Sequence, residues 1–244
     1  YSGFICANHY DVGATIKYGS LGTNGILNDG DAFDCDVNGD GIYDAETERF
    51  YYVNDLYNTT SKSWDKNYAV LIYYTTTYQG VADGTNTSAI AYNSSNKNYY
   101  GPIDAISNLP TTTQWKNVSL SSSTRTILTR NGRTTNMGET LPIFSYEGYA
   151  ARLLTIQEID EDCNDSYGDM SLTHNCQYFM ENTRFVPTAG VWGYWLENPY
   201  DNYESEVVSV NGDDYYGISM NYAWHSSTAG VRPVIEVPKE NIEY

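Results

Sequence analysis

Basic residues are scarce in this sequence. The 244 residues include 13 Lys and Arg against 31 Asp and Glu, which gives a net charge of −18. A surface that acidic repels phosphate backbones and anionic lipid headgroups. We therefore expect no nucleic-acid partner and no attraction to anionic membranes. Charged residues make up only 18% of the chain, so Asn, Ser, Thr and Gly must supply much of the polar surface.

Long apolar runs are also missing. No run approaches the ~18 residues that a membrane span requires, and no basic segment precedes an apolar stretch as in a signal peptide. We expect no membrane insertion by this segment. Because the chain begins with Tyr1, the sequence favours a mature or trimmed ectodomain whose export or anchoring segment is missing. The expected location is extracellular, either secreted or anchored to the cell surface.

Cysteine and histidine are few, and their spacing fits no metal motif. Cys6, Cys35, Cys163 and Cys176 contain no CxxC pair, and the three histidines do not complete a zinc pattern. Of three connectivities, the simplest joins Cys6 to Cys35 and Cys163 to Cys176. Two disulfides would indicate an oxidising, extracellular setting. The alternative is four buried free thiols in a cytosolic protein.

Helical signals are sparse, whereas strand signals are common. Thr155 and Glu158 form a capping-box pattern that predicts a helix start, and 177–182 and 110–117 are candidate short helices. Strands are predicted at 49–53, 69–74, 207–210, 215–221 and 230–237, with long loops at 84–98 and 130–139. The prediction is a single domain over 1–244 of the α+β class, mostly antiparallel strands with few short helices.

An acidic loop has the spacing of a calcium site. Asp36, Asn38, Asp40 and Asp44 occupy positions 1, 3, 5 and 9, Gly41 occupies position 6, and Ile42 would offer its carbonyl at position 7. Position 12 is Thr47, so the bidentate ligand would be Glu46, Glu48 or a more distant residue. The spacing predicts a structural calcium ion in an insertion near 31–48. The alternative is a solvated acidic loop of Asx turns.

Tyrosine is abundant, with 25 residues, and aromatic residues concentrate near the C-terminus. Nine aromatics lie between Trp192 and Trp224, a stretch of 33 residues without Lys or Arg. Such anchors among small polar residues are typical of binding surfaces. We expect Trp195 and Leu196 in the core. The residues expected to be exposed are Tyr200, Tyr203, Tyr215, Tyr216, Tyr222 and Trp224. The alternative is a turn-rich β protein, which also favours Tyr, Thr, Gly and Asn.

Three motifs occur in order: Ala-Arg-Leu-Leu-Thr at 151–155, Gly-Tyr-Trp-Leu-Glu-Asn-Pro at 193–199 and Gly-Val-Arg-Pro-Val-Ile at 230–235. Their order resembles the C-type-lectin-like domain of bacterial and phage surface proteins. It is similar to the variable proteins of diversity-generating retroelements and to the fold related to the formylglycine-generating enzyme. The resemblance covers roughly 100–240 and implies a C-type-lectin-like fold, in which Arg232 is structural and has a carboxylate partner.

The resemblance also implies where a ligand binds, because a late aromatic and Asn-rich segment carries the ligand-binding residues of the variable proteins. The corresponding residues here are Tyr200, Asp201, Asn202, Tyr203, Asp213, Asp214, Tyr215, Tyr216, Asn221, Tyr222, Trp224 and His225. Adenine-targeted codon mutagenesis would produce the Tyr, Asn, Asp, Ser and His residues of this segment. Lectins that bind sugar through calcium use Glu-Pro-Asn or Gln-Pro-Asp, whereas Glu197, Asn198 and Pro199 stand in another order, so that activity is not expected.

The predicted function is therefore non-enzymatic: a receptor or adhesion protein, diversified by a retroelement, that binds a protein or glycan on another cell or virus. Its acidic, Tyr-rich face would favour a neutral or basic ligand patch. One alternative is an enzyme like the formylglycine-generating enzyme, which needs reactive thiols; Cys163 and Cys176 lie 13 residues apart in an acidic segment that opposes thiolate formation. Another alternative is a pilin-like structural subunit of a surface filament.

Overall fold

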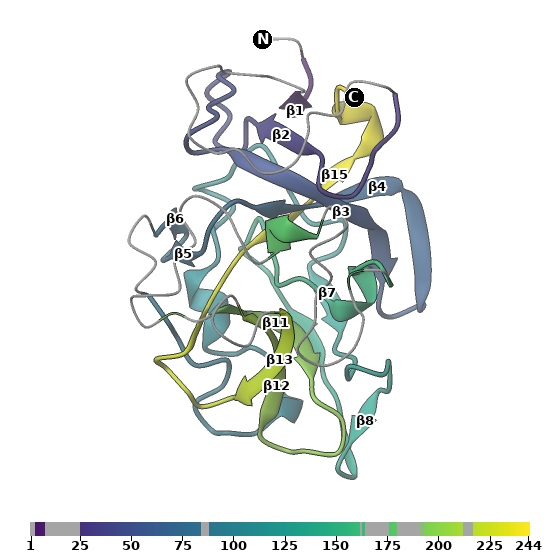
Figure 1. Ribbon diagram of the computed structural model, residues 1–244, viewed down its shortest axis with the longest axis vertical. Helices are drawn as coiled ribbons and strands as arrows, with labels where there is room; N and C mark the ends of the chain where they lie inside the picture. The colour runs from purple at the N-terminus through teal and green to yellow at the C-terminus, as the bar shows by residue number, and fades with distance from the viewer. Residues whose placement is uncertain are drawn as a thin grey trace.

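The computed structural model describes residues 3–7, 25–83, 88–161, 163, 176–179, 191, 193–211 and 217–244. Figure 1 shows β1 and the C-terminal residues toward the same end of the molecule. Within the described residues, no helix is both long and apolar enough to cross a membrane.

The first sheet contains five strands in the order β1-β2-β3-β4-β15, all antiparallel. These strands are β1 (Cys6–Ala7), β2 (Ala32–Cys35), β3 (Arg49–Asn58), β4 (Ser63–Tyr73) and β15 (Val234–Pro238). Residues 69–73 of β4 are all buried, which explains why this strand is a continuous apolar run rather than an alternating one. The C-terminal strand β15 pairs with β4, so the chain closes back on its N-terminal half.

The second sheet has the order β13-β12-β11-β14. It contains β11 (Gly193–Pro199), β12 (Glu206–Asn211), β13 (Gly217–Tyr222) and β14 (Ala229–Gly230), and only the β11–β14 pair is parallel. Gly193 is required where β11 meets β12, because a Cβ there would lie 2.0 Å from the Val210 carbonyl oxygen. The predicted strands at 207–210 and 230–237 are confirmed, the latter as β14 and β15.

Short hairpins and single helical turns complete the described structure. The hairpins pair β5 (Thr77–Tyr78) with β6 (Val81–Ala82), β7 (Thr124–Thr126) with β10 (Ile143–Ser145), and β8 (Thr135–Asn136) with β9 (Glu139–Thr140). The 3₁₀ turns are η1 (Asn98–Tyr100), η2 (Ala105–Asn108), η3 (Ile156–Glu158), η4 (Gln177–Phe179) and η6 (Lys239–Asn241). Residues 130–139, predicted as a loop, therefore contain β8 and the first residue of β9.

The predicted α+β class is wrong. Every helical segment in the described residues is a 3₁₀ turn of three or four residues, and strands dominate. The capping box of Thr155 and Glu158 does form, but Ile159 is already extended. Segments this short cannot offset the cost of helix nucleation. The predicted helix at 110–117 is a series of turns. Of the predicted helix at 177–182, residues 180–182 lie outside the described residues.

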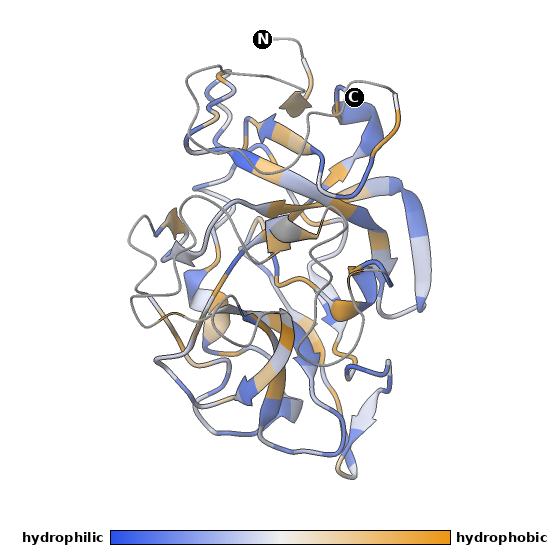
Figure 2. Cartoon of the chain, in the orientation of Figure 1, coloured by the Kyte–Doolittle hydropathy of each residue, from blue (hydrophilic) through white to orange (hydrophobic). Residues whose placement is uncertain are grey.

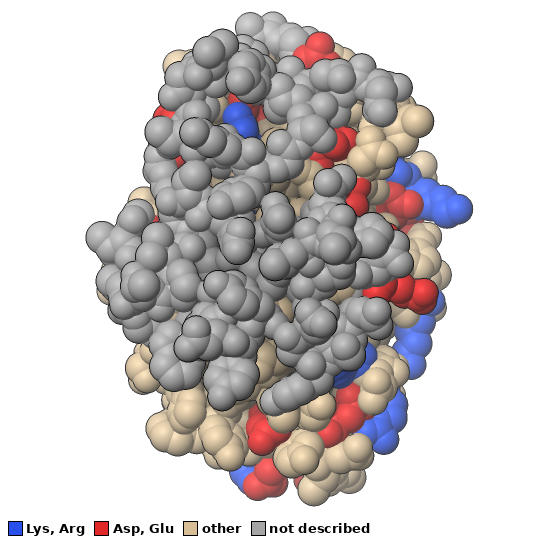
Figure 3. Space-filling view, viewed as in Figure 1, with Lys and Arg blue, Asp and Glu red and all other residues tan. Residues whose placement is uncertain are grey.

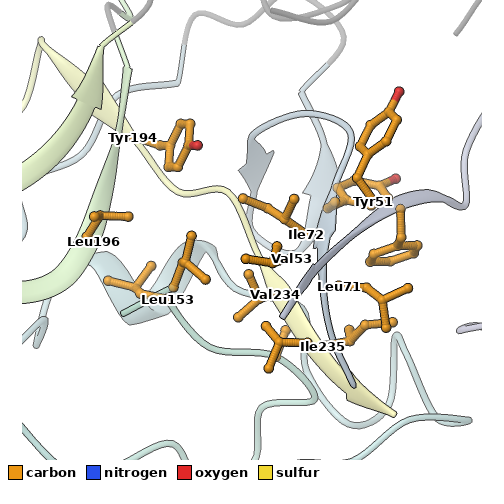
Figure 4. Packing of buried hydrophobic residues seen from close by; sticks show 14 of the residues in the cluster. Tyr51, Val53, Leu71, Ile72, Leu153, Tyr194, Leu196, Val234 and Ile235 are labelled. Carbon is orange, nitrogen blue, oxygen red and sulfur yellow. The ribbon is translucent and has the colours of Figure 1, made fainter. Parts of the chain in front are cut away.

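Buried residues of both sheets belong to one hydrophobic core. In Figure 4, Val234 and Ile235 of β15 lie beside their ladder partners Ile72 and Leu71 of β4, and Leu153 lies on their other side. Figure 2 shows the apolar residues gathered on these strands. Trp195 and Leu196 are fully buried, which confirms their expected place in the core.

Two disulfides connect the predicted pairs. Cys6 and Cys35 are opposite each other in the β1–β2 ladder, and Cys163 is bonded to Cys176. All four cysteines are therefore paired. This pairing confirms the disulfides expected from the local spacing of the cysteines.

Buried ion pairs join segments that are distant in the sequence. Arg152 donates to Glu236 at 2.7 Å and to both oxygens of Glu158 at 2.9 and 2.8 Å, and all three side chains are buried. Arg125 donates to Glu197 at 3.1 Å. Burial raises the pKa of Glu236, but Arg152 and Arg125 outweigh that effect and hold its pKa below the usual value.

Candidate ligand-binding surface

Two chain segments meet at one end of the second sheet. Residues 200–205 join β11 to β12, and residues 222–225 comprise the last residue of β13 and the three that follow it. The Tyr200 amide donates to the Glu206 carbonyl at 2.9 Å, and the Ala223 amide donates to the Ser205 carbonyl at 2.7 Å. We call these two segments the sheet-end surface. Asn136 of β8 donates to the backbone of the sheet-end surface, so this surface lies at the end of the molecule where Figure 1 labels β8.

Three large aromatic side chains of the sheet-end surface are exposed to solvent. The exposed fractions are 48% for Tyr203, 46% for Tyr222 and 50% for Trp224. The His225 ring packs edge-on against Trp224 at 4.3 Å and against Tyr222 at 5.3 Å, measured between centroids. The structure therefore brings the predicted residues Tyr222, Trp224 and His225 together, and Tyr203 lies on the neighbouring segment of the sheet-end surface. Asp213, Asp214, Tyr215 and Tyr216, also predicted as ligand-binding residues, lie outside the described residues.

Two buried asparagines hold the 200–205 segment from beneath. The Asn98 amide nitrogen donates to the carbonyls of Tyr203 and Glu206, both at 2.7 Å. The Asn136 amide nitrogen donates to the Tyr203 carbonyl at 2.7 Å, and its oxygen accepts the Asn202 amide at 3.0 Å. Because these bonds fix the backbone in advance, the segment loses less conformational entropy on binding. The sequence analysis missed both residues.

Asp201, predicted as a ligand-binding residue, makes internal hydrogen bonds instead of facing solvent. Its carboxylate is buried and accepts bonds from Arg133 Nε and from the Asn131 amide, both at 2.9 Å. Asn202 follows with a φ of +66°, a left-handed conformation that asparagine tolerates better than most residues. Asn221 donates to the Ser209 hydroxyl at 2.9 Å. Asp201 and Asn221 thus hold the shape of the surface through hydrogen bonds. The side chains exposed on it are those of Tyr203, Tyr222 and Trp224.

A groove of about 530 Å³ lies beside the exposed aromatics. It is lined by Arg130, Asn131, Tyr200, Asp201, Asn202, Tyr203 and Met220. The rings of Tyr200 and Tyr203 lie 5.7 Å apart, and the Arg130 guanidinium lies over the Tyr200 ring at 5.7 Å. Tyr200 is half-buried against the core rather than freely exposed as predicted. Arg130, Asn131 and Met220 were not predicted, because only the folded chain brings 130–131 and 220 to residues 200–203.

The acidic loop joins β2 to β3 and folds around its own carboxylates. Asp36 accepts the amides of Asp40 at 3.0 Å and Gly41 at 3.1 Å, and Asp40 accepts the amide of Ile42 at 2.8 Å. Gly41 has a φ of +85°, which explains glycine at the turn. Asn38 accepts the Asp40 amide at 2.8 Å, and Asp44 accepts the Glu46 amide at 2.9 Å.

Glu48 closes this loop. Its side chain is buried, and its two oxygens accept the amides of Asn38 and Asp44, each at 3.3 Å. Burial raises the Glu48 pKa to about 7, and Asp36 and Asp40 add repulsion in the same direction. Glu48, one of the two glutamates that the sequence left open, thus holds the loop with its side chain. The all-oxygen donor set and the buried carboxylate fit a calcium ion.

A tighter convergence of ligand atoms occurs elsewhere. Asp29, Cys163 and Cys176 place ligand atoms within 4.8 Å of one another, but both sulfurs belong to a disulfide. Asp29 instead bonds to the Tyr178 hydroxyl. Burial raises the Asp29 pKa to about 7 against the opposing effect of that bond. Within the described residues, the loop carboxylates do not form a group that converges this closely.

Arg232 is fully buried, which confirms a structural position for it. Its guanidinium donates to the carbonyls of Tyr73 at 2.6 Å and Phe179 at 3.1 Å and lies over the Tyr194 ring at 5.2 Å. The expected carboxylate partner is not among its contacts in the described part of the chain. The guanidinium of Arg232 contacts carbonyl oxygens and an aromatic ring instead of a carboxylate.

Neither models of protein families, nor curated proteins, nor solved structures match this chain. The resemblance to the variable proteins stays a prediction from the three motifs.

Proposed function

We propose that this chain is a non-enzymatic extracellular ligand-binding protein of the receptor or adhesion type. The observation that carries the proposal is the exposure of Tyr203, Tyr222 and Trp224 on a backbone fixed by buried amides. Tyrosine and tryptophan offer large contact areas at low entropic cost and dominate binding energies at interfaces. The ligand is a protein or glycan on another cell or virus. Both disulfides support the extracellular setting.

The enzyme alternative needs reactive thiols, and all four cysteines are held in disulfides. It would therefore require prior reduction of Cys163–Cys176, beside the buried Asp29 carboxylate. Diversification by a retroelement belongs to the proposal as well. If it occurs, genomic copies from one population differ at codons 198–228 and keep Asn98 and Asn136 unchanged.

A paired substitution tests the binding surface. Tyr203→Ala/Trp224→Ala is expected to weaken binding at least 100-fold, since each exposed anchor contributes about 2 kcal/mol. Binding is measured on a printed glycan array and on a panel of intact bacterial cells. The matched control is Tyr78→Ala/Trp64→Ala, which removes similarly exposed rings on β5 and β4. Wild-type binding in the test pair, equal loss in the control pair, or no binding to any probe would contradict the proposal.

We also propose that the 36–48 loop binds calcium in a structural role. Calcium neutralises the repulsion among Asp36, Asp40 and Glu48, so adding it to chelator-treated protein is expected to raise the melting temperature by roughly 5–10 °C at 100 times the dissociation constant. The shift is measured by calorimetry. Asp36→Ala is expected to abolish it, whereas Asp65→Ala on β4 leaves it intact. A melting temperature insensitive to calcium, or a shift that survives in Asp36→Ala, overturns the assignment.

A further inference from the structure

We infer that the groove beside the sheet-end surface recognises a carboxylated sugar, with Arg130 binding the carboxylate; this inference rests on the proposed function. Arg130 lines the groove, is half-buried, and is positioned by its amide, which donates to the Pro199 carbonyl at 3.0 Å. Its guanidinium contacts the Tyr200 ring and has no carboxylate partner in the described residues. A guanidinium is planar and can hold a carboxylate through two parallel hydrogen bonds.

The neighbouring charges are already paired. Arg133 lies 2.8 Å from Asp201, and Lys97 lies 2.8 Å from Glu204. Figure 3 shows acidic and basic side chains next to one another at the lower edge of the molecule. Glu206, the other nearby described carboxylate, is not part of the lining, and burial raises its pKa. Arg130 therefore leaves the described lining with one uncompensated positive charge.

The net charge of −18 does not cancel this local charge. At physiological ionic strength charges are screened over about 8 Å, so a bound ligand senses mainly the groups lining the groove. The sequence-based expectation of a neutral or basic ligand patch rested on net charge and is not carried into this inference. Within the described lining, the free charge is Arg130.

The remaining lining suits a ligand rich in hydroxyl groups. Within the described residues, no hydrogen bond occupies the Asn131 side chain, the Asn202 amide nitrogen or the hydroxyls of Tyr200 and Tyr203. Met220 is the one aliphatic side chain of the lining. Apolar peptide anchors need dry, apolar pockets, which this groove does not provide. A sugar ring can use the amides and hydroxyls for its polar edge and the tyrosine rings for its C–H face.

The test compares acidic sugars with neutral counterparts on wild-type protein. Sialyllactose is paired with lactose, and a glucuronate-terminated disaccharide with its carboxyl-reduced form, so the two arms distinguish the sources of the carboxylate. We expect at least one acidic member to bind tenfold or more tightly than its neutral counterpart and to weaken with added salt. Arg130→Gln is expected to remove that preference, and Arg130→Lys to restore part of it. Lys66→Gln, which removes an exposed charge on β4, is the control and is expected to keep it.

The outcomes separate this inference from the proposed function. Equal binding of acidic and neutral sugars, or an unchanged preference in Arg130→Gln, overturns the carboxylate site while the aromatic surface stands. Binding to cells that depends on Tyr203 and Trp224 without binding to any of the four sugars also overturns the inference alone. Absence of binding to sugars and cells alike overturns both.

Discussion

Replacing Arg152 with alanine is expected to destabilise the fold by roughly 3–5 kcal/mol, because the substitution leaves two carboxylates buried without a counter-charge. Glu158 and Glu236 are at most 2% exposed, and Arg152 is their shared partner. The Ser121 amide would be the remaining donor to Glu236. The change acts at the contact of η3 with β15, so we expect the loss to appear as global unfolding rather than local fraying.

Urea denaturation at pH 7 measures the effect, with Lys97→Ala as the matched control. Lys97 also pairs with a carboxylate, but the two side chains are 35% and 52% exposed to solvent, so its loss should cost far less. If Arg152→Ala does not fold, Arg152→Met with Glu158→Gln and Glu236→Gln should recover folded protein, since uncharged replacements remove the stranded charges. A loss from Arg152→Ala no larger than that from Lys97→Ala would show that the buried pairs contribute little.

The sequence predicted the strands well where local chemistry decides. The β-branched and aromatic run predicted at 69–74 forms the buried part of β4 over 69–73, and 49–53 begins β3. The disulfides were also predictable, because each pair is close in sequence. The helices were not, since the partners of the Thr155 region come from far along the chain. Glu236 lies 84 residues beyond Arg152, and Glu158 of η3 binds the same guanidinium.

The candidate surface shows the same division. Exposed aromatic residues near the C-terminus were anticipated from composition. Their support was not, because Asn98 and Asn136 reach Tyr203 across 105 and 67 residues. An asparagine in a loop gives no local sign of such a role. The positive charge of the groove could not be predicted from the sequence either, because the net charge does not show which ionic groups pair with one another.

Removing the Cys6–Cys35 disulfide is the second large perturbation. With Cys6→Ala/Cys35→Ala, we expect a loss of about 3–4 kcal/mol in the free energy of unfolding, mainly because the unfolded chain regains the freedom of a loop of 29 residues. Native contacts add to the effect. The two-residue strand β1 is held at the sheet edge by its ladder to β2 and by the Glu243 amide, which donates to the Cys6 carbonyl at 2.9 Å.

The matched control is Cys163→Ala/Cys176→Ala, which opens a loop of 13 residues and should cost roughly 0.7 kcal/mol less on the chain-entropy account. Urea denaturation measures both. The two variants should also differ at the acidic loop, because the Asp36 amide donates to the Ile5 carbonyl at 2.9 Å beside the first disulfide. Only loss of Cys6–Cys35 should therefore weaken calcium binding. Equal calcium affinity in both variants would mean that the loop keeps its shape without β1, and a loss under about 1 kcal/mol would mean that β1 contributes little to the fold.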